Sequence, residues 1–213
     1  MQDWDLFLAP YEQVVKELKI KLRGIRNQYV GLAEHAPIEF VTGRVKSKQS
    51  ILDKCKRRSI KLENIADEMY DIAGLRIMCQ FVEDIEEVIN LIKERTDFVV
   101  VDEIDYLSRQ KESGYRSYHL IIKYPIHWRN KEREVYAEIQ IRTLAMNFWA
   151  TIEHSLNYKY RGEYPEEIRA RLRNAAEAAY LLDNEMSEIR AEVKEAQRYF
   201  TVNQNPVEGR YEN

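Results

Sequence analysis

Two expected strands carry polar side chains that could do chemistry. Residues 133–142 alternate between apolar and polar side chains, and the polar face of such a strand carries Glu138. Residues 117–124 alternate in the same way and leave His119 on a mainly polar face. If the two strands are neighbours, these side chains share the floor of a cleft. The other polar residues of that floor are then Gln140 and Arg142.

A second carboxylate could reach the same cleft. Asp71 comes just before the apolar run 73–82, where it could point along the edge of a sheet. Two carboxylates on adjacent strands suit a Mg²⁺ ion that bridges nucleotide phosphates, because this cation takes oxygen ligands and keeps several waters. A single carboxylate is more often a surface residue than a ligand. Whether the two carboxylates act as metal ligands therefore depends on the residues around them.

A basic segment could hold those phosphates. Residues 44–61 contain eight Lys or Arg side chains against the single acid Asp53, on a chain whose net charge is −3. The sequence has no glycine-rich phosphate motif, so side chains would have to bind the phosphates. The alternative is a solvated helix face. We give that interpretation to Lys56, Arg57 and Arg58.

Helices and strands alternate along the chain and predict an α+β fold in which helices flank a mixed sheet. Residues 105–116 are expected to form a mobile loop, and residues 127–132 a polar turn. The expected elements are a helix from Tyr11 to before Pro37, a short strand or extended loop at 38–45, a helix at 48–58, a strand at 73–82, a helix at 84–95 capped by Asp84, strands at 98–101, 118–125 and 133–142, and a helix from its cap Thr143 to about Tyr160.

The clearest helical pattern lies near the C-terminus. From about Pro165 to Phe200, apolar residues recur at alternating steps of four and three. Such a helix would extend roughly 54 Å, longer than a domain of this size is wide. We expect its far end to pack on another helix, from the same chain or from a second subunit. The tail, residues 201–213, is expected to be disordered.

Length and composition predict one catalytic domain, residues 1–200, in the cytoplasm. The 213 residues, 45% of them hydrophobic, allow one sizeable core. No apolar run approaches the roughly 20 residues of a membrane span, and the N-terminus lacks a signal pattern. Cys55 and Cys79 have no metal-ligand spacing and are too few for a disulfide framework. The acidic net charge argues against a protein that coats nucleic acid.

Four long segments carry a family resemblance. They are PIEFVTGRVKSKQSI (37–51), YDIAGLRIMCQF (70–81), KESGYRSYH (111–119) and EIQIRTLAMNFWATIEHSLNYKY (138–160). Together they resemble the small alarmone synthetases of the RelQ type, in the RelA/SpoT family. The resemblance implies a nucleotidyltransferase-like sheet and the transfer of a diphosphate from ATP to the 3′-hydroxyl of GDP or GTP. The products would be AMP and ppGpp or pppGpp, with GMP left open as an acceptor.

The resemblance also implies roles on the ATP side. Asp71 and Glu138 resemble the family's Mg²⁺ carboxylates, and Glu138 is also the candidate base for the 3′-hydroxyl. Arg44 and Arg76 resemble a pair whose guanidinium planes sandwich adenine, a use that suits a planar, weakly hydrated cation. The residues that resemble ATP phosphate contacts are Lys46, Ser50 and Lys54.

On the acceptor side, Tyr115 resembles an aromatic platform for guanine and Asn147 a group that reads the base. Lys111 and His119 resemble ligands of the acceptor phosphates. Structural alternatives stand beside these roles. Tyr115 could anchor a loop, and Arg76 could cap a sheet edge. His154 is interpreted as a core histidine rather than a catalytic group.

Two positions depart from the family pattern. Ile104 stands where a basic residue is expected, and Ser47 replaces an expected proline. Neither touches the proposed metal ligands. Longer relatives add a hydrolase built around a His-Asp metal site, but none of the four histidines here is followed by aspartate. We therefore expect synthesis only, without the regulatory domains of the longer enzymes.

Two other classes of function remain as alternatives. A non-catalytic nucleotide- or RNA-binding regulator could use the basic segment and Tyr115 as a stacking platform, although a pure binder has no use for the Mg²⁺ pair. A structural coiled-coil protein would explain only the last helix. For partners, the resemblance narrows self-association to a homotetramer whose central cleft could bind a regulatory nucleotide. RNA binding is left open without being predicted, and no membrane partner is expected.

Overall fold

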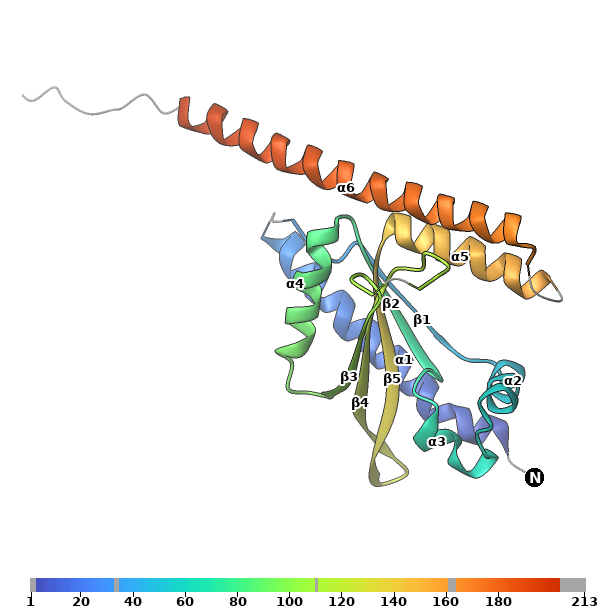
Figure 1. Ribbon diagram of the computed structural model, residues 1–213. Helices are drawn as coiled ribbons and strands as arrows, with labels where there is room; N and C mark the ends of the chain where they lie inside the picture. Colours follow the sequence, from blue (N-terminus) through green and yellow to red (C-terminus); the bar gives the residue numbers. More distant parts are fainter. Residues whose placement is uncertain (1–2, 33–34, 110, 161–163, 204–213) are drawn as a thin grey trace, which may run out of the picture.

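The computed structural model describes residues 3–32, 35–109, 111–160 and 164–203, and its centre is a five-stranded sheet (Figure 1). The order across the sheet is β1-β2-β5-β4-β3. β2 and β5 run parallel, and the other neighbours are antiparallel, so the predicted mixed sheet is confirmed. The strands are β1 (Phe40–Val45), β2 (Ala73–Cys79), β3 (Val99–Asp105), β4 (Tyr118–Trp128) and β5 (Lys131–Thr143).

One face of the sheet is apolar and is covered by two helices. α1 (Trp4–Gly31) and α4 (Val82–Lys93) pack against this face and against each other, where Tyr29 donates to Glu87 at 3.0 Å. A Cβ on Gly43 would lie 2.7 Å from Leu75 Cδ1 and 2.9 Å from a methyl carbon of α1, so only glycine lets α1 approach β1 this closely. The other face of the sheet is left for polar side chains.

The predicted helix boundaries hold in some places and not in others. α2 (Lys48–Arg58) has the predicted bounds, and the hydroxyl oxygen of Ser47 caps it by accepting from the Ser50 N–H at 3.3 Å. α1 begins seven residues before Tyr11, at Trp4, because Asp3 caps it. The short helices η1 (Leu62–Asn64) and α3 (Ile65–Glu68) were not predicted.

The predicted cap of α4 was wrong. Asp84 lies in the first turn, three residues after the capping position of Phe81, and accepts from the Phe81 N–H at 3.2 Å. A carboxylate can satisfy the helix terminus by reaching back from this position, so it does not mark the first residue. The helix consequently begins at Val82.

The predicted turn at 127–132 was too long, whereas the loop lies close to its predicted bounds of 105–116, between the end of β3 at Asp105 and the start of β4 at Tyr118. β4 and β5 form a hairpin with only two turn residues, Arg129 and Asn130, which have positive φ angles of 49° and 62°. Such turns match the twist of the flanking strands, so pairing continues through polar positions. β3 runs from Val99 to Asp105, four residues beyond the end of the predicted strand at 98–101.

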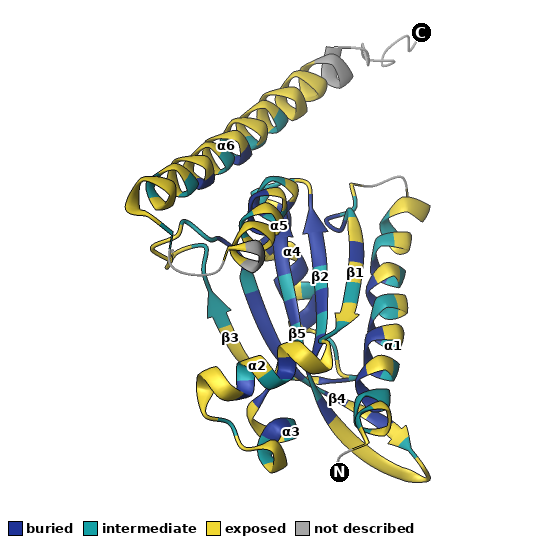
Figure 2. Ribbon diagram, turned by 90° about the vertical axis from the view of Figure 1, so that its right-hand side faces the viewer, coloured by how far each residue is buried: buried dark blue, intermediate teal, exposed yellow. Residues whose placement is uncertain are grey.

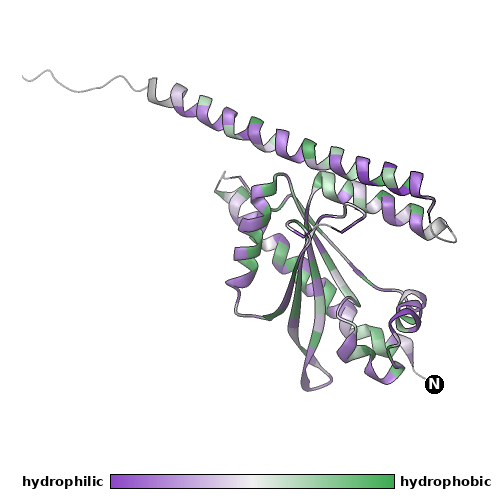
Figure 3. Ribbon diagram, viewed as in Figure 1, coloured by the Kyte–Doolittle hydropathy of each residue, from purple (hydrophilic) through white to green (hydrophobic). Residues whose placement is uncertain are grey.

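Two helices lie at the end of the sheet. α5 (Leu144–Lys159) begins at its predicted cap Thr143, which accepts from Met146 at 3.1 Å. α6 (Glu166–Asn203) runs along α5 and continues beyond it, with most of its surface exposed (Figure 2). Hydrophobic and hydrophilic residues alternate along its length (Figure 3). Residues 201–203 are helical, and the rest of the predicted tail, 204–213, lies outside the described residues. In the described parts of the chain, no helix is long and apolar enough to cross a membrane.

Candidate active site

The register of the sheet brings polar residues from different strands into two rows on the face opposite α1. Directly paired residues point to the same side of a sheet. The first row follows the pairing of Arg44, Gly74, Glu138 and Ile121. The second row follows the pairing of Thr42, Arg76, Gln140 and His119. The predicted neighbourhood of His119 and Glu138 is thereby confirmed.

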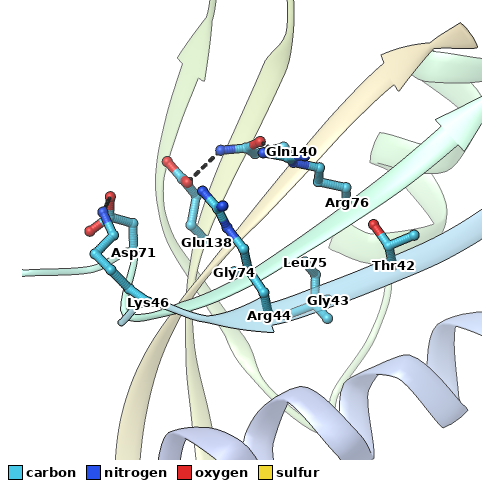
Figure 4. A pocket seen from close by; sticks show the side chains of 10 residues that line it. All are labelled: Thr42, Gly43, Arg44, Lys46, Asp71, Gly74, Leu75, Arg76, Glu138 and Gln140. Atoms are coloured by element: carbon cyan, nitrogen blue, oxygen red, sulfur yellow. Dashed lines mark hydrogen bonds and ion pairs between the residues drawn. The ribbon is translucent and has the colours of Figure 1, made fainter. Parts of the chain in front are cut away.

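A pocket of about 280 Å³ opens over the β1, β2 and β5 ends of these rows. Figure 4 shows both carboxylates and three basic side chains directed at it. Its lining residues are Thr42, Gly43, Arg44, Lys46, Asp71, Gly74, Leu75, Arg76, Glu138 and Gln140. Five residues predicted from the sequence to serve ATP and metal therefore share one cavity.

Asp71 is held by two lysines. Its Oδ2 accepts from Lys46 Nζ at 2.5 Å and from Lys54 Nζ at 2.7 Å, and its Oδ1 is buried without a hydrogen-bond partner among the described residues. Burial by itself would raise the pKa of Asp71, but the hydrogen bonds from Lys46 and Lys54 outweigh it and lower that pKa. For Lys54, burial outweighs the same ion pair and lowers the pKa of the amine. The ion pair favours both charged groups, and only at Lys54 does burial prevail over it.

Glu138 is held by His119 and Gln140, which both belong to the second row. Its Oε1 lies 3.0 Å from His119 Nδ1, and its Oε2 accepts from Gln140 Nε2 at 2.7 Å. Burial opposes ionisation of this carboxyl, but the hydrogen bond and charge of His119 and the bond from Gln140 together lower the pKa of Glu138. An ionised, oriented carboxylate can accept a proton from a hydroxyl placed in the pocket.

The two arginines lie on neighbouring strands at the pocket wall. Arg44 pairs with Gly74, and Arg76 is the next residue of β2 on the same face. Arg76 Nε donates to Gln140 Oε1 at 3.2 Å, whereas Arg44 is exposed. Both guanidinium groups can therefore meet a flat ligand that enters the pocket.

A second cluster surrounds Tyr115 beside the pocket. Its hydroxyl lies 2.9 Å from His119 Nε2 and accepts from Arg142 Nη2 at 2.5 Å. Lys111 Nζ lies 4.8 Å from the centre of the Tyr115 ring. The Tyr106 ring packs against the Tyr115 ring, with 5.7 Å between the two ring centres. This cluster is continuous with Glu138 through His119.

Two predicted site residues are not joined to these groups by any contact that the structure describes. Ser50 is exposed in the first turn of α2, where its hydroxyl accepts from Ser47 at 2.9 Å. Asn147 is half-buried on α5, and its Oδ1 lacks a hydrogen-bond partner among the described residues. His154 is exposed, so its interpretation as a core histidine was wrong, because that turn of α5 faces solvent.

Sequence reasoning missed Tyr106 and Thr42. Tyr106 was placed in a mobile loop, but Asp105 accepts from the Leu107 and Ser108 N–H groups and holds an ordered turn. An Asp followed by such a turn is a recognisable signal. Thr42 gave no signal of its own, because only the register places it beside Arg76. Ile104 pairs with His119 and adds an apolar side chain at the end of the second row.

The donor set fits a magnesium ion. Within the described ranges, no group of three His, Cys, Asp or Glu side chains could hold a metal, so the protein offers only two carboxylates. Mg²⁺ is commonly bound by one or two carboxylates, with waters and substrate phosphates completing its shell. The unpartnered, buried Oδ1 of Asp71 is the kind of oxygen that such a cation requires.

The sequence and the structure of this chain are both similar to those of known proteins. Residues 43–163 match a region found in RelA and SpoT proteins. The chain is 60% identical over 200 residues to the GTP pyrophosphokinase YjbM of Bacillus subtilis, an alignment that covers 94% of each chain.

Two solved structures of Bacillus subtilis small alarmone synthetase 1 are also similar. The one bound to its product pppGpp has a TM-score of 0.88 and 60% identity, covering 91% of this chain and 99% of that chain. The one bound to AMPCPP has a TM-score of 0.81 and 59% identity, covering 90% and 98%.

Proposed function

The chain belongs to the family of RelA/SpoT proteins and is a GTP pyrophosphokinase, and we propose that it carries out this reaction in the pocket between β1, β2 and β5. It moves the β,γ-diphosphate of ATP to the 3′-hydroxyl of GDP or GTP and makes ppGpp or pppGpp and AMP. The observation that supports this most is a single cavity that contains Asp71 and Glu138 beside three basic side chains.

Glu138 is the proposed base. The acceptor 3′-oxygen attacks the β-phosphorus of ATP and forms one P–O bond, while the bond from that phosphorus to the oxygen shared with the α-phosphate breaks. AMP leaves with that oxygen, and the 3′-hydroxyl proton passes to a carboxylate oxygen of Glu138. His119 and Gln140 orient this carboxylate, and its lowered pKa keeps it ionised near neutral pH.

Asp71 and Glu138 are the proposed ligands of Mg²⁺. When bound, the ion would neutralise charge that develops on the phosphate oxygens. Asp71 can use its free Oδ1 while Oδ2 stays with the lysines. The lysines remain close enough to contact phosphates that share the site, which supports Lys46 and Lys54 as ATP phosphate ligands.

The remaining ATP contacts follow the pocket wall. Arg44 and Arg76 flank the opening from adjacent strands, and guanidinium groups stack well on flat rings. We place adenine between them. Ser50 is a weaker part of this proposal, because it is exposed and already bonded to Ser47.

The acceptor is proposed to bind on the Tyr115 side, with guanine on the tyrosine ring and its phosphates near Lys111 and His119. Both ring nitrogens of His119 are already engaged, with Glu138 and with Tyr115. Contact with a phosphate would therefore exchange one of these bonds. Asn147 as a guanine-reading group rests on its unpartnered Oδ1, which can accept from a base.

One assay tests the reaction and the acceptor together. Purified protein is incubated with ATP, Mg²⁺ and GDP, GTP or GMP in turn, and the products are separated by anion exchange. We expect AMP to form in equal amount with a 3′-diphosphorylated guanine nucleotide, and no activity when Mg²⁺ is chelated. Absence of such a product with all three acceptors would refute the function. A product formed equally well after chelation would refute the metal role.

Self-association is a further part of the proposal. α5 and α6 form an apolar groove of about 790 Å³, and its rim leaves Phe148 68% and Leu182 56% exposed. The stripe continues along α6 through Met186, Ile189 and Val193, all exposed. Soluble chains seldom leave such a surface uncovered, and closed symmetric assemblies are the usual solution. We propose a homotetramer, with a regulatory nucleotide in its central cleft, in the cytoplasm.

Light scattering tests this assembly. Met186→Asp combined with Ile189→Asp places charges in the stripe and should reduce the molar mass of the particle. The matched control changes the exposed polar residues Glu185 and Glu192 of the same helix to Lys, which also alters charge but leaves the stripe intact. A monomeric wild type, or an oligomer that resists the Asp pair, would show that α6 does not mediate assembly.

A further inference from the structure

The segment 111–119 carries three proposed acceptor contacts, but its Arg116 points elsewhere. Arg116 is only 5% exposed and reaches α6 rather than the pocket. Its Nη1 donates to the Ala176 carbonyl at 3.2 Å, and its Nη2 lies 3.3 Å from a Glu177 carboxylate oxygen. The guanidinium carbon sits 4.0 Å from the centre of the Tyr180 ring. One side chain thus makes three kinds of contact with one helix.

The backbone of the same segment also rests on α6. Gly114 has a φ of +84°, a conformation that other residues rarely adopt. A Cβ at this position would lie 2.5 Å from the Cβ of Ala176. Its N–H donates to the Lys111 carbonyl at 2.8 Å, so the turn that carries Lys111 is closed against the helix. Small side chains on both partners allow this close approach.

The neighbours of Arg116 point the opposite way. The Tyr115 hydroxyl meets Arg142 and His119, and the Ser117 hydroxyl accepts from Arg142 Nε at 3.1 Å. Successive side chains therefore alternate between the cluster around Tyr115 and α6. The position of Tyr115 is therefore set from both sides.

α6 is well suited to act as a fixed support. Trp149 donates to the Leu172 carbonyl at 2.9 Å, and Thr143 donates to Asp183 at 2.7 Å, on either side of the Arg116 contact. These bonds join α6 to α5 and to the end of β5. A buried guanidinium that lost its partners would be costly, so the segment and the helix are expected to stay together.

We propose that Arg116 is a positioning residue that holds the acceptor segment against α6 and thereby presets Tyr115 and Lys111 for the guanine nucleotide. Arg116 does not touch substrate in this arrangement. This inference rests on the proposed function, because it assigns a specific support to the acceptor side of that site. It predicts a change in acceptor binding without a change in ATP binding.

Calorimetry on the full chain provides the test, with GDP and a non-hydrolysable ATP analogue as separate probes. Arg116→Ala should weaken GDP binding on the order of tenfold, as expected if the competent segment falls to about a tenth of the population. ATP-analogue binding should stay within twofold of wild type. Arg116→Lys keeps a cation over Tyr180 and should recover part of the loss. Arg109→Ala, an exposed cation of the same loop, is the matched control.

Gly114→Ala supplies a second route to the same state, because its new methyl group would displace the turn from Ala176. In steady-state assays, Arg116→Ala and Gly114→Ala should both raise KM for GDP while KM for ATP changes little. The melting temperature is expected to fall, because both changes disturb a buried contact, so the contrast between the two nucleotides decides the inference. Equal losses for the two nucleotides in Arg116→Lys and Gly114→Ala, or wild-type GDP binding in Arg116→Ala, would overturn the inference. A wild-type protein that binds no GDP and forms no product would refute the proposed function itself.

Discussion

The two halves of the site are built differently. The donor half, comprising Arg44, Lys46, Asp71 and Arg76, lines an open pocket in which Arg44 is exposed and an Asp71 oxygen is unpartnered. The acceptor half, comprising Lys111, Tyr115, His119 and Arg142, is closed on itself by hydrogen bonds and ring contacts. Glu138 lies at the boundary and belongs to both.

This difference bears on how each nucleotide enters. A ligand on the donor half meets two groups that are already available, the exposed Arg44 and the Oδ1 of Asp71, so fewer internal bonds have to be exchanged there. A ligand on the acceptor half must exchange existing hydrogen bonds for new ones, and only the surplus contributes to affinity. The acceptor half should accordingly depend more on how its segment is held. The following experiments test this contrast, from the largest expected effect to the smallest.

Glu138→Gln removes the group that both halves share. An amide cannot take the 3′-hydroxyl proton or neutralise a metal ion, so kcat should fall by at least about 10²–10⁴-fold. The fold should persist, because glutamine can still accept from Gln140. Rapid-quench or steady-state assays report kcat, and circular dichroism reports folding. Near wild-type turnover with unchanged Mg²⁺ dependence would show that Glu138 is not the base.

Tyr115→Ala probes the acceptor half alone. Loss of base stacking should cost roughly 1–3 kcal/mol in binding of the guanine nucleotide, while ATP binding is spared. Tyr115→Phe keeps the ring and should restore most of the affinity, although it removes the hydroxyl that meets His119 and Arg142. Calorimetry that found equal losses for ATP and GDP would reassign Tyr115 to loop structure.

Arg44→Ala probes the donor half. Because Arg44 is exposed, its stacking on adenine should be worth about 0.5–1 kcal/mol, seen as a rise of a few-fold in KM for ATP with KM for GDP unchanged. Arg58→Ala is the matched control, since this exposed arginine ends α2 away from the pocket lining. An identical effect of the two variants would reduce the role of Arg44 to general charge.

Lowering the pH is expected to have the smallest effect on activity. The pKa values of Asp71 and Glu138 are both lowered from their ordinary values of 3.8 and 4.5, by hydrogen bonds that outweigh burial. Both stay ionised in mild acid. Their contribution to stability is present above the ordinary values and is lost as pH falls through the lowered ones. kcat/KM should therefore show no loss from these carboxylates between pH 8 and about 5. An acidic limb near pH 6 that Glu138→Asp shifts would contradict this.

Local pattern was sufficient for several elements and insufficient for others. The bounds of α2 and the cap Thr143 followed from short-range signals, because a capping side chain and a helical run are neighbours in sequence. Asp84 misled because the same carboxylate can serve as a cap or reach back from the first turn. The turn at Arg129 and Asn130 was predicted too long because the flanking strand residues, such as Lys131 and Glu132, are polar and show no strand pattern.

Some features of the candidate site could likewise be predicted from the sequence, and others could not. Strand alternation alone placed Glu138 and His119 on polar faces, and the chain's own residues predicted two carboxylates beside a basic segment. The resemblance to small alarmone synthetases supplied the roles of Arg44, Arg76 and Tyr115. Neither indicated that Lys46 and Lys54 meet on the same oxygen of Asp71, or that Tyr106 packs on Tyr115.

The sequence by itself determined the fold class, the faces of the strands and the reaction, because periodicity and family motifs depend on residues a few positions apart. Only the tertiary structure decided which polar faces adjoin, since strand order and register are set by long-range pairing. That pairing brought residues 64 positions apart in sequence, such as Arg76 and Gln140, into one row. It also turned Arg116 toward α6, a direction that depends on where a helix some 60 residues later comes to pack.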